Sequence, residues 1–179
     1  MLSKLTPNQI VRRLEDVDLD ALAARGIRAL LVDLDNTLCP WSSSQPSPEC
    51  EEWIRRARER FGVCIVSNSL RPGRLRRVAE ALGIRAVGRW GWGRKPFAGG
   101  ILAALRELQV EPSEAAMLGD QIMTDVLGGN RLGLYTVWVL PLEGAEFLGT
   151  KPARLVEKLL LRRFRRMGLY PPSEKIEAE

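Results

Sequence analysis

Two aspartates separated by one residue are the most reactive pair in the chain. Asp33 and Asp35 follow the apolar run Ala29 to Val32, which has the length and residue types of a buried strand. Side chains two apart in an extended segment point to the same side, so these carboxylates would repel each other unless a cation lies between them. Such a pair can bind a hard cation and supply a nucleophile. The alternative interpretation is a polar turn that ends a strand, with Asn36 and Thr37 shaping it.

Other polar residues occupy comparable positions. Ser67 and Asn68 follow a second apolar run, Asp120 follows another, and Lys95 precedes a helical pattern. In open parallel sheets, ligands bind beyond the carboxyl ends of the strands. Each residue also has a purely structural explanation, since Ser67 and Asn68 could end a strand and Asp120 could cap a helix. Lys95 could be one more solvated cation among 27 basic residues. Their joint occurrence at strand ends favours a single site.

The chain contains no histidine. This excludes Ser-His-Asp and Cys-His catalysis, histidine general bases and most zinc chemistry. The remaining groups are carboxylates, lysine, hydroxyls and an oxygen-binding metal. That set suits phosphoryl transfer, in which catalysis is mostly positioning and neutralisation of charge.

Size and composition indicate one globular domain with short appendages. The chain has 179 residues, 45% of them hydrophobic, with a net charge of +5. No apolar run approaches the roughly 20 residues that span a bilayer. The first ten residues lack a signal-peptide pattern, so we expect a cytoplasmic protein. Three irregularly spaced cysteines predict reduced thiols, two of them buried, rather than disulfides.

The elements that must position these residues alternate between strand and helix. The patterns predict strands at 29–32, 63–66, 84–87, 115–118 and 134–140, and helices at 48–60, 73–82, 97–108 and 122–132. Such alternation is typical of an α/β protein: a three-layer α/β/α, Rossmann-like parallel sheet. The strand order 3-2-1-4-5 would bring Asp33, Ser67 and Asp120 to one edge. Gly128 and Gly129 within the last helix predict close packing or a distorted helix end.

Three segments make up the predicted organisation. Residues 1–26 form a helical lead-in that starts after Thr6-Pro7, residues 27–148 form the core, and residues 149–179 form a basic amphipathic helix and a tail. Residues 151–166 carry seven cations and one anion around an apolar stripe. This helix could bind an anionic membrane surface, or it could pack its apolar face on the domain with its charges solvated.

The residues named above form a recognisable set. Asp-Leu-Asp-Asn-Thr (33–37), Ser67, Lys95 and Gly-Asp-Gln-Ile-Met-Thr-Asp (119–125) resemble, in order and spacing, the four motifs of the haloacid dehalogenase-like phosphatases. The longer run 119–131, together with Lys95-Pro96, is similar to the YqeG branch, which is related to mitochondrial phosphatidylglycerophosphate phosphatase. The resemblance covers residues 26–140.

The resemblance implies a role for each catalytic residue. Asp33 would attack phosphorus and form an aspartyl-phosphate. Asp35 would protonate the leaving alkoxide and then deprotonate the attacking water. Ser67, Asn68 and Lys95 would bind the phosphoryl group, and Lys95 would also keep Asp33 ionised.

The resemblance also implies a Mg²⁺ cofactor. Asp33, the backbone carbonyl of Asp35, and Asp120 would contact the ion, and Asp125 would support the metal shell. Mg²⁺ fits because it accepts few protein carboxylates and keeps several waters beside a phosphate. Taken alone, Asp125 could equally be a surface carboxylate on a helix.

Many relatives carry a cap domain over the site, and this sequence has no room for one. The segment 39–48 is short, and the roughly 28 residues between Ser67 and Lys95 are filled by a helix and a strand. An open site suits a phosphate displayed on a large molecule. Water could be excluded from it by the substrate, by an oligomer partner, or by Trp41, Trp90 and Trp92. The resemblance to the YqeG branch, together with the basic C-terminal helix, implies a phosphorylated lipid such as phosphatidylglycerophosphate as the substrate, with soluble nucleotide or sugar phosphates as the alternative. A non-catalytic adaptor for RNA or membrane would be a third function, which the intact acidic motifs disfavour.

Overall fold

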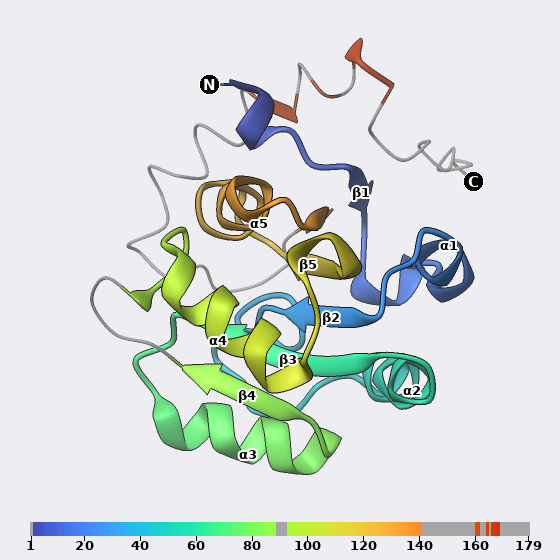
Figure 1. The fold of residues 1–179 in the computed structure, drawn as a ribbon. Helices are drawn as coiled ribbons and strands as arrows, with labels where there is room; N and C mark the ends of the chain where they lie inside the picture. Colours follow the sequence, from blue (N-terminus) through green and yellow to red (C-terminus); the bar gives the residue numbers. More distant parts are fainter. Residues whose placement is uncertain (1, 89–92, 141–159, 162–163, 165, 169–179) are drawn as a thin grey trace, which may run out of the picture.

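The chain folds around one sheet of six parallel strands, in the order β1-β6-β5-β2-β3-β4 (Figure 1). The computed structural model describes residues 2–88, 93–140, 160–161, 164 and 166–168. The strands are β1 (Gln9–Val11), β2 (Ala29–Val32), β3 (Gly62–Ser67), β4 (Arg85–Gly88), β5 (Ala115–Gly119) and β6 (Tyr135–Val139). The α-helices are α1 (Leu19–Ala24), α2 (Pro48–Arg58), α3 (Pro72–Leu82), α4 (Ala98–Leu108) and α5 (Leu127–Leu132). Shorter helical turns are η1 (Leu2–Leu5), η2 (Leu14–Asp16), η4 (Pro112–Glu114) and η5 (Ile122–Val126).

The predicted strand order is confirmed for the five strands that the sequence pattern identifies. These are β2 to β6, and their spatial order β4-β3-β2-β5-β6 is the predicted 3-2-1-4-5. The connection from β2 to α2, residues 33–47, contains no helix or strand. No cap is therefore inserted at this point of the described chain.

The sixth strand corrects the prediction of a purely helical lead-in. The helix expected after Pro7 is wrong, because Gln9–Val11 pairs in parallel with β6, with Ile10 opposite Trp138. Three residues are too few for a strand period to be distinguished from a helical one. The free edge of β6 decides the outcome by supplying backbone partners, such as the Val11 carbonyl that accepts from the Leu140 N–H at 2.9 Å. Within the same lead-in, the helical prediction is confirmed for α1, which Asp18 caps.

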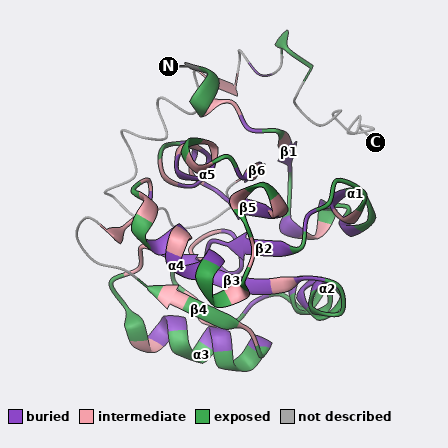
Figure 2. Cartoon of the chain, in the orientation of Figure 1, coloured by how far each residue is buried: buried purple, intermediate pink, exposed green. Residues whose placement is uncertain are grey.

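Alternating side chains of the central strands fill a core on each face of the sheet. Leu30 and Val32 belong to the cluster that contains α2 and α3 side chains, whereas Ala29 and Leu31 belong to the cluster under α4. Figure 2 shows these strands buried between helices whose outer sides are exposed. Complete burial of β2 on both faces holds its carboxyl end, and therefore Asp33, in a fixed position.

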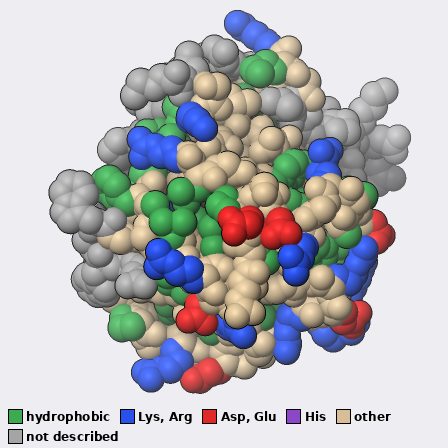
Figure 3. All heavy atoms as spheres, in the orientation of Figure 1, with side chains coloured by type: hydrophobic (Ala, Val, Ile, Leu, Met, Phe, Trp, Pro, Cys, Tyr) green, Lys and Arg blue, Asp and Glu red, His purple; other side chains and the backbone are tan. Residues whose placement is uncertain are grey.

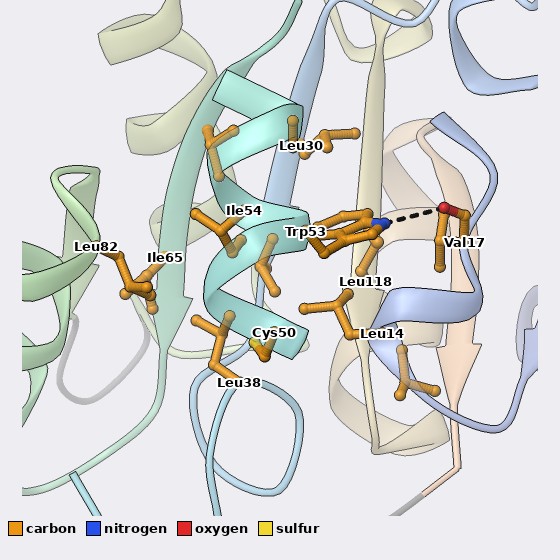
Figure 4. Close-up of a cluster of buried hydrophobic side chains, with 14 of the residues drawn as sticks. Leu14, Val17, Leu30, Leu38, Cys50, Trp53, Ile54, Ile65, Leu82 and Leu118 are labelled. Atoms are coloured by element: carbon orange, nitrogen blue, oxygen red, sulfur yellow. Dashed lines mark hydrogen bonds between the residues drawn. The ribbon is translucent and has the colours of Figure 1, made fainter. Parts of the chain in front are cut away.

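A buried tryptophan ties the N-terminal segment to the domain. Trp53 of α2 donates from Nε1 to the Val17 carbonyl at 3.0 Å, and Leu14 packs beside it (Figure 4). The indole is 3% exposed, so this bond satisfies a buried donor. Residues 1–26 are thus integrated with the sheet through both β1 and this contact.

The predicted last helix is divided in two. Residues Ile122–Val126 form a π-helical turn, and α5 continues to Leu132. The close packing expected at the glycines is confirmed, because a Cβ on Gly129 would lie 2.7 Å from Cγ2 of Thr136. Because Gly129 has no side chain, α5 can approach β5 and β6 closely.

Three of the described residues in the C-terminal basic segment pack on the domain. Phe164 is 1% exposed and meets Trp138 edge-on, with ring centroids 6.1 Å apart. Leu160 and Leu161 lie against the same cluster. At these positions the apolar face contacts protein. The rest of the predicted helix, and Trp90 and Trp92, lie outside the described residues.

Candidate active site

A cleft of about 470 Å³ opens at the carboxyl edge of the sheet, where the predicted site residues meet. Its lining includes Asp33, Asp35, Asn68 and Lys95. A larger hollow of about 670 Å³ lies at the opposite edge, but Glu107 is the one acidic residue in its lining. The donors that a hard cation needs therefore lie at the smaller cleft.

Lys95 lies at the centre of the site and pairs with two aspartates. Its Nζ is 2.5 Å from Oδ1 of Asp33 and 2.6 Å from Oδ1 of Asp125, and its side chain is 1% exposed. Burial by itself would lower the pKa of Lys95, but the charges of Asp125 and Asp33 outweigh it and raise that pKa above the ordinary value. Lys95 is therefore a permanent cation beside the predicted nucleophile.

Asp33, Asp120 and Asp125 form a compact carboxylate cluster. One oxygen of each lies within 4.8 Å of the others, and all three side chains are buried. Burial raises the pKa of Asp125 to about 6, against the opposing effect of Lys95 and with further repulsion from Asp33. Three oxygen donors without histidine or cysteine fit a hard divalent cation such as Mg²⁺. Asp125, which the resemblance assigns to the support of the metal shell, thus lies in the same cluster as Asp33 and Asp120.

The backbone conformation of residues 122–126 positions Asp125 in the cluster. The π-helical turn places it over the end of β5, where the Gln121 N–H donates to its Oδ2 at 3.1 Å. Gly119 leaves the necessary space, because a Cβ there would lie 2.3 Å from Cγ of Asp125. Trp138 holds the neighbouring backbone by donating to the Asp120 carbonyl at 2.9 Å.

Asp35 is not part of the carboxylate cluster and pairs with Arg74 instead. The sequence analysis did not identify Arg74 as a residue of the site. Arg74 is 4% exposed and bonds Asp35 Oδ1, the Ser43 carbonyl at 2.6 Å and the Pro40 carbonyl at 2.9 Å. Burial and then the charge of Asp33 raise the pKa of Asp35, and Arg74 opposes both. Arg74 therefore fixes Asp35 together with the loop that carries it. Nothing in the spacing of the chain distinguishes this arginine from its neighbours.

Ser67 and Asn68 lie beside Lys95 at the end of β3. Ser67 is 2% exposed, and its Oγ accepts from the Ser69 N–H at 3.0 Å, so the hydroxyl can still donate. The side chain of Asn68 makes a reciprocal pair with the backbone of Lys95. Its Oδ1 accepts from the Lys95 N–H and its Nδ2 donates to the Lys95 carbonyl, both at 2.9 Å. Asn68 thus positions Lys95, a role that its location in the sequence does not suggest.

This arrangement has a counterpart in a known family. Residues 9–133 match the model for haloacid dehalogenase-like hydrolases. The chain belongs to this family. The predicted family, fold and class of enzyme are therefore confirmed.

Individual relatives agree with this assignment. The chain is 32% identical over 170 residues to the probable phosphatase YqeG of Bacillus subtilis (strain 168), covering 94% of this chain and 96% of that protein. It is 29% identical to phosphatidylglycerophosphate phosphatase 1, chloroplastic/mitochondrial, of Arabidopsis thaliana, covering 97% of this chain and 52% of the plant protein. A crystal structure of a protein from Listeria monocytogenes serotype 4b shares the fold at a TM-score of 0.53, with 21% identity over 76% of this chain and 99% of that one.

Proposed function

We propose that this hydrolase is a Mg²⁺-dependent phosphomonoesterase that acts through an aspartyl-phosphate. The observation that carries the proposal is the buried set of Asp33, Asp120, Asp125 and Lys95, of which Asp33 and Lys95 line the cleft. A carboxylate nucleophile held by a permanent cation, next to further carboxylates that can bind a metal, suits phosphoryl transfer. Asp33, Asp120 and Asp125 would hold Mg²⁺, with the backbone carbonyl of Asp35 as a further ligand. The ion supplies positive charge that offsets the negative charge of the phosphate.

The side chains have separate tasks in this reaction. A carboxylate oxygen of Asp33 forms a bond to phosphorus while the bond from phosphorus to the leaving oxygen breaks. Asp35 donates its proton to that oxygen, and its raised pKa favours the protonated form that this step requires. In the second step Asp35 accepts a proton from water, which attacks phosphorus and releases Asp33. Lys95 offsets charge on the phosphoryl group, and Ser67 donates a hydrogen bond to it.

For the substrate, we propose a phosphorylated lipid head group such as that of phosphatidylglycerophosphate. Two observations support this class. Two relatives, each 29% identical to this chain, are named phosphatidylglycerophosphate phosphatases. In addition, the described chain has no cap inserted between β2 and α2. Among the described residues, no helix is both long and apolar enough to cross a bilayer. We propose that the enzyme reaches this lipid peripherally, at the inner face of the membrane.

A phosphate-release assay tests both the proposed reaction and the proposed substrate. The wild-type protein should hydrolyse p-nitrophenyl phosphate with Mg²⁺ and stop when EDTA removes the metal. Asp33→Asn should abolish activity while the protein remains folded by circular dichroism. Unchanged activity in this variant would refute the nucleophile assignment. Parallel assays with dispersed phosphatidylglycerophosphate, glycerol phosphate and nucleotides should rank the lipid first, and a soluble ester ranked first would refute the lipid proposal alone.

A further inference from the structure

Exposed hydrophobic side chains gather at the edge of the sheet that carries the site. The described chain has four large ones, and three of them are Leu70, Phe97 and Met123, with exposed fractions of 57%, 43% and 36%. Leu70 comes three residues after Ser67, Phe97 two after Lys95, and Met123 three after Asp120. Each therefore extends the loop or turn that supplies a site residue. We call these three side chains the apolar rim.

Two of the three segments that carry the apolar rim are basic, and none of the three contains an acidic residue. Residues 68–77, 93–98 and 121–124 contain no aspartate or glutamate. Two of their arginines, Arg71 and Arg94, line the cleft itself, and Arg71 lies over the ring of Trp41 at 4.2 Å. On the face drawn in Figure 3, by contrast, basic side chains are scattered among acidic ones. Apolar side chains and arginines thus occur together around the cleft, on segments that contribute no acidic residue of their own.

We propose that the apolar rim docks on an anionic lipid bilayer, with the mouth of the cleft held against the head groups. Separate apolar side chains at loop tips can enter the boundary between head groups and acyl chains, while neighbouring arginines attract anionic lipids. Docking also closes the cleft against bulk water, which a cap does in other arrangements of this kind. The inference deepens the proposed function and rests on it for its catalytic consequence. Binding to the bilayer itself is independent of catalysis.

Sedimentation with lipid vesicles tests the docking surface directly. The full-length protein should sediment with vesicles of phosphatidylcholine containing phosphatidylglycerol and much less with pure phosphatidylcholine, and high salt should release it. Met123→Glu should lower vesicle affinity about tenfold, the equivalent of one apolar side chain left unburied. Combining it with Phe97→Glu should lower the affinity further. Both side chains are exposed and belong neither to the carboxylate cluster nor to the lining of the cleft, so both variants should retain Mg²⁺-dependent hydrolysis of p-nitrophenyl phosphate.

A matched control distinguishes the apolar rim from the C-terminal segment. Met167 is 51% exposed and lies outside the rim, so Met167→Glu should leave vesicle binding unchanged. An equal loss in Met167→Glu would overturn the proposal, as would equal binding to neutral and anionic vesicles or no binding to either. Asp33→Asn should bind vesicles like the wild type. A failure of the phosphatase proposal would therefore appear in the activity assay, and a failure of the docking proposal in sedimentation.

Discussion

Gly119→Ala should disrupt the proposed metal site, because the added methyl group would overlap with Asp125. The new Cβ would lie 2.3 Å from Cγ and Oδ2 of Asp125, and 2.6 Å from its Cβ. Because the Cβ of Asp125 is attached to the backbone, rotating the carboxylate alone cannot relieve the overlap. The π-helical turn must shift, which separates Asp125 from Lys95 and from Asp33.

The size of the effect follows from this geometry. Overpacking a rigid site costs about 1–3 kcal/mol of unfolding free energy. Displacing one member of the carboxylate cluster should weaken Mg²⁺ binding about 10–100-fold, as loss of supporting groups commonly does. The two losses should therefore be of similar size, since a 10–100-fold weaker binding corresponds to about 1.4–2.8 kcal/mol. Isothermal titration with Mg²⁺ and urea unfolding without metal measure the two quantities separately.

Gly73→Ala is the matched control for this substitution. Gly73 lies in the first turn of α3, and no atom lies within 4 Å of its added Cβ. Alanine favours a helix over glycine by roughly 0.5–1 kcal/mol, so this variant should be as stable as the wild type or slightly more so. If Gly119→Ala bound Mg²⁺ and hydrolysed p-nitrophenyl phosphate like Gly73→Ala, the proposed position of Asp125 in the metal site would be refuted.

Three further predictions follow from other parts of the structure. Arg74→Met should slow hydrolysis of glycerol phosphate about 10–100-fold more than that of p-nitrophenyl phosphate, since the aryl leaving group depends less on protonation by Asp35; equal losses in kcat would show that Arg74 only supports the fold. Burial raises the pKa of every thiol, so none should react rapidly with Ellman's reagent at pH 8 until urea unfolds the protein, and fast native labelling would contradict that burial. The thiols and their raised pKa values are Cys39 (about 11), Cys50 (about 12) and Cys64 (about 12). Phe164→Ala should cost about 3–5 kcal/mol of unfolding free energy and change the fluorescence of Trp138, whereas a loss below about 1 kcal/mol would mean that the C-terminal segment does not hold this cluster.

The sequence is most informative where a segment is buried on both faces. The runs that became β2, β3 and β5 are apolar throughout, so their type and their polar ends are visible without coordinates. The strand β1 is not visible in this way, because its three residues take their conformation from the edge of β6, where each pairs with a residue 128 positions away. All three cysteines are buried where two were expected.

Arg74 illustrates a contact that no local pattern encodes. Its partners Asp35, Pro40 and Ser43 lie 31 to 39 positions away in the chain. Their carbonyls and carboxylate converge only after the loop following β2 has folded back, with Asn36 at a φ of 60°. A basic residue in the first turn of a helix resembles any solvated arginine until that loop covers it. Long-range pairs of this kind follow from the tertiary fold, whereas a strand end follows from its own sequence.

The different surroundings of Asp33 and Asp35 depend both on the local sequence and on the tertiary fold. Alternation along a strand predicts two carboxylates on one side, with repulsion between them unless a cation intervenes. The structure supplies two cations, one for each carboxylate: Lys95 for Asp33 and Arg74 for Asp35. Because each aspartate has its own partner, Asp33 can join the carboxylate cluster while Asp35 lines the cleft, where we propose that it acts as the acid. Asp125 then completes the cluster from the far side of Lys95. The division of labour between the two aspartates therefore depends on where the cations lie, which spacing alone does not determine.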